Sequence, residues 1–277
     1  PPPPPPPRCF LGVDGLRDLV LSLVGSEMCI RDRLLGLFGL SSQAVRSTLT
    51  RVSRKGWLKS RKAGRNSFYS LTPQSTELLE EGAVRILQPR HDPWDGQWHL
   101  LTYSIPESKR HLRRRLRKQL IWLGFGALNH AAWISPRDLQ AEVEQIVKSL
   151  RVAPYVELFS GGHWGFSSDE EIIARGWDLE RLNDYYATFI DHHEPLFQEC
   201  QVMLGAGDSL APQECFKQRF MLVHEYRSSP YVDPNLPREL LPDDWQGERA
   251  TRLFQQYRDL LAEEAEAFVD SVMAKAP

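Results

Sequence analysis

The sequence has little cysteine and no long apolar run, and both scarcities restrict the class of protein. Four of the 277 residues are cysteines, and they form neither a CxxC pair nor a spacing typical of a zinc site. Scattered thiols fit a reducing cytoplasm, with a disulfide between Cys200 and Cys215 left as an open alternative. No apolar run reaches the roughly 18 residues that a bilayer span needs. We therefore expect a cytoplasmic protein without a membrane segment.

Residues 34–76 lack charge of one sign altogether. This stretch contains no Asp or Glu, whereas the whole chain has a formal net charge of -2. Its eight cations are Arg46, Arg51, Arg54, Lys55, Lys59, Arg61, Lys62 and Arg65. A short segment with such one-sided charge, in a slightly acidic protein, indicates a polyanionic partner.

The same stretch has the pattern of a winged helix–turn–helix. Ser41 is a suitable N-cap for a helix that runs to about Lys55, after a short apolar helical segment at 34–38. One face of that helix is expected to meet the core through Val45, Thr48, Leu49 and Val52. The opposite face, with its flanks, carries the candidate DNA-reading residues Gln43, Arg46, Ser47, Thr50, Arg51 and Arg54.

Two strands are expected to follow, over 58–61 and 67–71, and to form the wing. Arg61, Lys62 and Arg65 at its tip are the remaining candidate DNA contacts, to the backbone or the minor groove. The alternative interpretation is a helical hairpin with a solvated basic face. A connector helix over 75–87 completes the predicted DNA-binding domain at 34–88.

Residues 1–33 are expected to be a non-native or disordered leader. Seven prolines open the chain, and the later string LVGSEMCIRDR looks like a translated library adaptor.

Residues 93–175 predict a ferredoxin-like domain with the order βαββαβ. Strands are expected at 98–105, 125–128, 131–135 and 155–159, and helices after 106 and over 136–150. Seven of the ten residues in 109–118 are Lys or Arg. That basic helix is expected to contact DNA phosphates, to face an acidic partner or to be solvated.

This central segment resembles the small nuclease of CRISPR spacer acquisition, which has a metal-binding acidic residue near the end of its first strand. Ser104 occupies that position here, and a neutral serine does not replace a carboxylate as a ligand for a hard cation. A metal-dependent nuclease is therefore an alternative function with little support, and an RNA-binding scaffold is a third.

Residues 176–277 predict a mostly helical domain, with one long helix or two short ones over 178–204, another helix within 211–226 and a last helix over 248–273. The acidic last helix suits an interaction or dimer surface, or a solvated face. His192 and His193 are neighbours on a helix, without the i, i+4 spacing of metal-binding helices, so no metal site is expected. No catalytic residues are expected either.

Three long stretches, at 39–72, 94–138 and 219–254, resemble the PaaX-type transcriptional repressors, the family that controls phenylacetate breakdown in bacteria. The resemblance implies an α+β homodimer without a cofactor that binds palindromic operator DNA. It further implies release from DNA by an aryl-acetyl-CoA effector, typically phenylacetyl-CoA, whose binding residues are unknown. One departure from the family is Gln246, where the LLPxDWPG motif commonly has proline.

Overall fold

The computed structural model describes residues 34–63, 66–87, 93–227 and 233–274, and it has the α+β composition that the sequence predicts. The expected leader lies outside the described residues. The chain divides into two compact units, of which the first combines residues 1–89, 191–226 and 251–277. The second combines residues 90–190 and 227–250. Within the described ranges, no helix has both the length and the apolarity to cross a bilayer.

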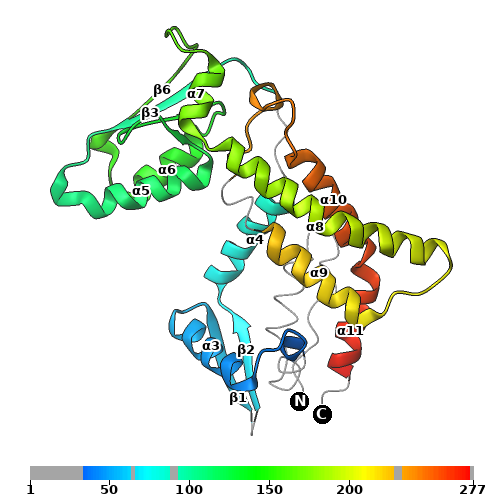
Figure 1. The fold of residues 1–277 in the computed structure, drawn as a ribbon. Coiled ribbons are helices and arrows are strands. Elements are labelled where there is room, and N and C mark those ends of the chain that lie inside the picture. The colour runs from blue at the N-terminus through cyan, green and yellow to red at the C-terminus, as the bar shows by residue number, and fades with distance from the viewer. Residues whose placement is uncertain (1–33, 64–65, 88–92, 228–232, 275–277) are drawn as a thin grey trace. The chain divides into compact units, whose positions relative to one another are not determined.

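The first unit begins with a helix and a hairpin (Figure 1). Helix α3 (Ser42–Arg54) precedes strands β1 (Leu58–Ala63) and β2 (Asn66–Leu71), which pair antiparallel. Ser41 caps α3, because its side-chain oxygen accepts a hydrogen bond from the Ala44 N–H at 3.3 Å. After the helix, Gly56 adopts a φ of +77°, a left-handed conformation that glycine takes without steric cost.

A pair of hydroxyl groups fastens the hairpin to the next helix, α4 (Pro73–Leu87). The Thr72 hydroxyl donates to the carbonyl of Gly56 at 3.0 Å, and the Ser75 hydroxyl donates to the carbonyl of Trp57 at 2.7 Å. The two hydroxyls also lie 2.9 Å apart. We call Thr72 and Ser75 the hydroxyl clasp; Ser75 is 2% exposed and therefore shielded from water, whereas Thr72 is half-buried.

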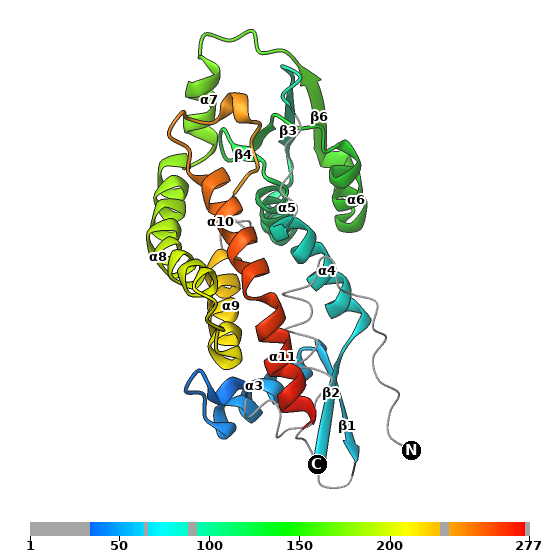
Figure 2. The ribbon, with the colours of Figure 1, turned by 90° about the vertical axis from the view of Figure 1, so that its right-hand side faces the viewer.

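Later helices complete the first unit. They are the part of α8 (Leu179–Gly205) from Asp191 onward, α9 (Pro212–Tyr226), the end of α10 (Gly247–Leu260) and α11 (Ala262–Ala274). Figure 2 shows α9 beside α11, which an ion pair between Arg219 and Glu266 connects at 3.1 Å. The prediction of one last helix is wrong in detail, because a turn at Leu261 separates α10 from α11. Helical backbone hydrogen bonds still continue on both sides of Leu261.

The interior of this unit contains two thiols beside a buried tyrosine. Tyr257 is fully buried and donates a hydrogen bond to the side-chain oxygen of Gln218 at 2.9 Å. Cys200 and Cys215 are buried free thiols, so the possible disulfide between them is not formed. Burial raises the pKa of the Cys215 thiol to about 11. Both cysteines therefore contribute to the core rather than to redox chemistry.

The second unit is built on a four-stranded antiparallel sheet. Its elements follow the expected order: β3 (Trp98–Tyr103), α5 (Arg110–Leu123), β4 (Gly126–Ala127), β5 (Ala132–Ser135), α6 (Gln140–Leu150) and β6 (Val156–Gly161). The strands lie in the order β4-β5-β3-β6, so β3 is central and β6 is at an edge.

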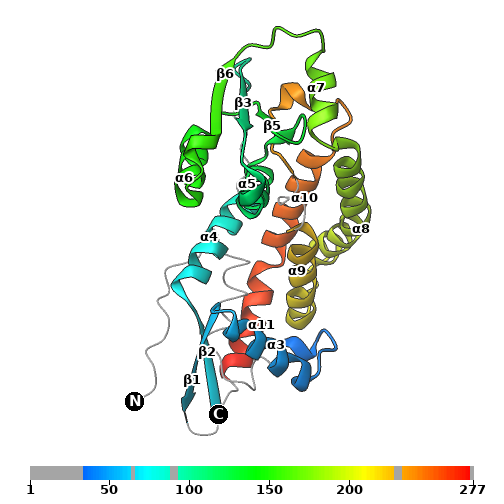
Figure 3. The same cartoon turned by 90° about the vertical axis from the view of Figure 1, so that its left-hand side faces the viewer.

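Alternation along the strands gives the sheet two buried faces. Leu101 and Trp133 pack on one face with Leu116 and Leu120, two of the leucines that recur at every fourth position along α5. The opposite face carries a second hydrophobic core. There Trp98 and Ile134 of the sheet pack with α7 (Asp169–Gly176) and residues 236–240. Successive strand residues point to opposite faces, which explains this division. Figure 3 shows α5 and α6 near the sheet.

On the second face of the sheet, the backbone around β4 packs closely against the Trp177 side chain. A Cβ atom at Gly126 would lie 2.7 Å from the Trp177 ring, so only glycine permits the present packing. The Trp177 indole N–H donates to the carbonyl of Gly124 at 3.0 Å.

Gln246 makes a backbone contact within the same unit. Asn183 accepts a hydrogen bond from the Gln246 backbone N–H at 2.7 Å, a bond that proline at 246 would not make.

Candidate nucleic-acid interface

Helix α3 carries the predicted DNA-reading residues on one exposed face. Successive residues of a helix are about 100° apart, which places all six predicted side chains within an arc of about 140°. They are exposed without exception: Gln43, Arg46, Ser47, Thr50, Arg51 and Arg54. We call these six residues the α3 polar face.

The opposite side of α3 is apolar and faces the core. Val45 is 5% exposed, and Leu49 and Val52 are half-buried. Thr48, in contrast, is exposed, so the prediction that it joins the core is wrong. It lies about 60° from Val45 around the helix, at the border of the apolar side, where a short polar side chain remains in solvent.

The hydroxyl of Thr50 is already used within the helix. Its oxygen donates to the carbonyl of Arg46 at 2.9 Å, one turn earlier. The proton is therefore not available for a phosphate in this rotamer, although the oxygen retains acceptor capacity. Sequence reasoning does not detect this back-bonding, because it depends on the rotamer that the threonine adopts.

The β1–β2 hairpin presents its cations on two sides. Arg61 and Lys62 are exposed neighbours on β1, and neighbouring strand residues point to opposite faces. Lys59 is exposed as well and lies on the same side of the strand as Arg61. The predicted set of DNA contacts omits Lys59. The third predicted wing residue, Arg65, lies outside the described residues.

A distant helix supports the start of this interface. The Phe38 ring, shortly before α3, lies 4.4 Å from the Phe220 ring and 6.3 Å from the Phe216 ring, measured between centroids. Phe216 is 2% exposed, which places this aromatic contact at the edge of the core of the first unit. The contact joins residues about 180 positions apart, so no local sequence pattern indicates it.

The basic helix α5 uses part of its charge within the second unit. Arg113 pairs with Glu107 at 2.8 Å, and the Lys109 ammonium donates to the Tyr155 hydroxyl at 3.0 Å. The Arg117 guanidinium lies over the Trp133 ring at 5.7 Å. The remaining cations are exposed, namely Arg110, Arg114, Arg115 and Lys118.

Among the residues that the structure describes, no group of three potential metal ligands lies at the position expected for a nuclease carboxylate. Ser104 is exposed directly after β3, and its backbone N–H donates to the carbonyl of Tyr155 at 2.9 Å. In the described part of the chain, a group of three potential ligands occurs at His192, His193 and Glu225, in the other compact unit. The sheet therefore offers no support for metal-dependent cleavage.

Comparison with known proteins assigns the chain to a family. Three family models match consecutive segments: a PaaX-like protein model at residues 23–75, the PaaX protein central Cas2-like domain at 91–173 and the PaaX-like protein C-terminal domain at 177–271. The transcriptional repressor PaaX of Escherichia coli (strain K12) is 35% identical over 239 residues, which cover 85% of this chain and 74% of that protein. The chain belongs to the PaaX family.

A solved structure has a related fold. An uncharacterized protein from Mycobacterium tuberculosis aligns with a TM-score of 0.58 and 21% sequence identity, over 94% of this chain and 99% of the other. At this identity, the likeness concerns the fold alone. Within the PaaX family assignment, α3 and the β1–β2 hairpin fall inside the segment that the first family model matches.

Proposed function

We propose that the chain is a transcriptional repressor of a phenylacetate-type catabolic operon, which acts by binding operator double-stranded DNA. The observation that carries the proposal is the α3 polar face, in a segment without any carboxylate. Its E. coli relative is named a transcriptional repressor, which favours a regulator over an enzyme.

In this proposal, α3 is the recognition helix of a winged helix–turn–helix and enters the major groove. Arginine pairs bidentately with guanine and glutamine with adenine, so Arg46 and Gln43 would supply base contacts. The Ser47 hydroxyl and the two remaining cations of the face, Arg51 and Arg54, would hold the phosphates. The hairpin cations Lys59, Arg61 and Lys62 would lie along the backbone, where they add affinity without sequence preference.

Family membership supports two further parts of the proposal. A homodimer would place two α3 helices on a palindromic operator, with half-sites about one helical turn of DNA apart. An aryl-acetyl-CoA, phenylacetyl-CoA in the first instance, would release the repressor by binding the free form better than the DNA-bound form.

The strand order β4-β5-β3-β6, with α5 and α6 on one face, favours a ferredoxin-like central domain.

The test is a binding titration of the full chain on promoter DNA of a phenylacetate operon, followed by fluorescence anisotropy at several salt concentrations. With roughly 6–10 phosphate contacts, affinity should fall about 10³- to 10⁵-fold between 50 and 200 mM salt. Phenylacetyl-CoA should reverse binding, whereas free CoA should not. Binding without preference for the operator over scrambled DNA would contradict the proposal, and insensitivity to phenylacetyl-CoA would contradict its effector.

A further inference from the structure

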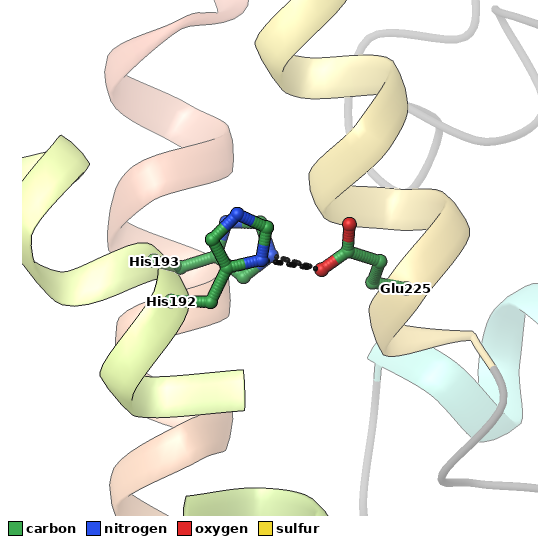
Figure 4. A group of neighbouring side chains, drawn as sticks. All are labelled: His192, His193 and Glu225. Carbon is green, nitrogen blue, oxygen red and sulfur yellow. Dashed lines mark hydrogen bonds and ion pairs between the residues drawn. The ribbon is translucent and has the colours of Figure 1, made fainter. Parts of the chain in front are cut away.

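Two neighbouring histidines and a glutamate converge on one point in the first unit (Figure 4). The His192 Nδ1 atom lies 3.0 Å from Glu225 Oε2, and the His193 Nε2 atom lies 2.8 Å from the same oxygen. The histidines belong to α8 and the glutamate to α9. These three potential ligand atoms all lie within 4.8 Å of one another. We call these residues the His–His–Glu cluster.

Adjacent helix residues point about 100° apart, yet both rings reach the same carboxylate. They do so because His192 uses the ring nitrogen nearest its backbone, whereas His193 uses the nitrogen at the far end of its ring. The ring centroids lie 4.5 Å apart with an interplanar angle of 34°. Sequence spacing within α8 does not indicate this convergence, because the third member comes from another helix.

The surroundings of the cluster are closed on one side and open on the other. The side chain of His193 is 3% exposed, and its ring lies 6.4 Å from the ring of the buried Tyr257. The side chain of His192 is 58% exposed and that of Glu225 is 30% exposed. Core packing therefore fixes one ligand, while solvent reaches the other two. A site of three protein ligands with an accessible fourth position has this arrangement.

The distances are close to those that a metal ion would require. Zinc bonds to histidine nitrogen and carboxylate oxygen are about 2.0–2.2 Å long, which puts tetrahedral ligand atoms roughly 3.4 Å apart. The present nitrogen–oxygen separations of 2.8 and 3.0 Å are thus about half an ångström short. Rotation of the exposed His192 and the half-buried Glu225 side chains would supply that movement.

We propose that His192, His193 and Glu225 form a binding site for a divalent transition-metal ion of the zinc class. Two imidazoles and one carboxylate suit zinc, cobalt or nickel, whereas magnesium and calcium prefer oxygen ligands throughout. A water molecule would occupy the fourth position on the solvent side. The bound ion would link α8 to α9, the helix whose Phe220 contacts Phe38 ahead of the α3 polar face. The site is distinct from the proposed DNA contacts and does not depend on them.

Metal binding is measured on the full chain without an affinity tag, after a chelator has removed bound metal. The Cys9→Ser/Cys29→Ser double variant is the background for all measurements, because it removes two thiols that would compete for zinc. Equilibrium dialysis against ZnCl₂ should yield one zinc ion per chain. Cobalt should give the visible absorption of a tetrahedral complex without thiolate charge-transfer bands. Zinc should also raise the thermal unfolding midpoint, because ligands of the folded state stabilise it.

Variants separate the metal site from a simple hydrogen-bonded cluster. His192→Gln and Glu225→Gln should each weaken zinc binding by at least about 100-fold, since loss of an outer-shell partner alone costs roughly 10- to 100-fold. His111→Gln, at an exposed position on α5, is the matched control and should leave binding unchanged. Two variants are used so that a folding defect in one leaves the other decisive. Equal zinc binding by the wild type and both folded variants, or none by the wild type, would overturn the proposal.

Discussion

Arg46 and Lys62 are both exposed cations, yet their settings predict different contributions to DNA binding. Arg46 lies on the α3 polar face, among side chains that a base edge in the major groove would meet. Lys62 lies on strand β1, where a flexible ammonium at a hairpin edge suits phosphate rather than base contact.

Arg46→Ala should cost about 1–3 kcal/mol of operator binding and relax the base preference at one operator position. Lys62→Ala should weaken binding to every sequence alike and lower the salt slope by about 1. Anisotropy titrations on operator and scrambled DNA measure both effects. Arg181→Ala, an exposed arginine of α8 in the other compact unit, is the charge-matched control. Loss of specificity in Lys62→Ala, but not in Arg46→Ala, would refute the placement of α3.

At the residue scale, helical periodicity predicted most of the α3 surface correctly. Val45 and the polar residues opposite it follow directly from the 3.6-residue repeat. Thr48 at the border and the back-bonded Thr50 did not follow, because exposure at a helix flank and rotamer choice depend on neighbouring elements. The predicted contact set lacks Lys59, although strand alternation places it on the same side of β1 as Arg61.

The hydroxyl clasp fixes the hairpin relative to the start of α4. Ser75→Ala removes its 2.7 Å hydrogen bond to the Trp57 carbonyl and its contact with Thr72. We expect the free energy of unfolding to fall by about 1–2 kcal/mol, since a buried hydrogen bond contributes roughly that much. Urea titration monitored by circular dichroism gives the value.

Ser70→Ala, at an exposed position on β2, serves as the matched substitution for the clasp. Its effect should stay within about 0.5 kcal/mol, as for most surface substitutions. Equal stability of Ser75→Ala and Ser70→Ala would show that the clasp does not stabilise the hairpin.

At the element scale, the order of strands and helices in residues 93–161 could be predicted, because each strand alternates and the basic helix has a regular leucine stripe. The start of α3 could be predicted as well, from Ser41 as its cap. The turn at Leu261 could not, since backbone hydrogen bonding continues through it and no glycine or proline marks it.

At the scale of the whole molecule, the first compact unit is discontinuous in sequence. It combines the N-terminal segment with residues 191–226 and 251–277. Local sequence patterns do not predict that segments so far apart in the chain belong to one unit. The division of the chain into domains at 34–88, 93–175 and 176–277 stays a prediction. The His–His–Glu cluster was missed for the same reason, as Glu225 follows His193 only after a helix end, a loop and most of α9.

A fragment comprising residues 34–89 alone should be less stable than the same segment in the full chain. It lacks Phe216 and Phe220, so Phe38 would lose its aromatic partners. Urea titration should find the fragment unfolded, or unfolding without a cooperative transition, at concentrations where the full chain remains folded. A sharp transition of the fragment at the same midpoint as the full chain would contradict the structural role of α9.

The contact between Phe38 and α9 also has a consequence for synthesis on the ribosome. Phe216 follows Phe38 by about 180 residues, and translation adds about 5–20 residues per second. Phe38 therefore waits roughly 10 to 40 s for its aromatic partners on α9. In the proposed repressor, DNA binding would therefore mature only after translation has passed α9.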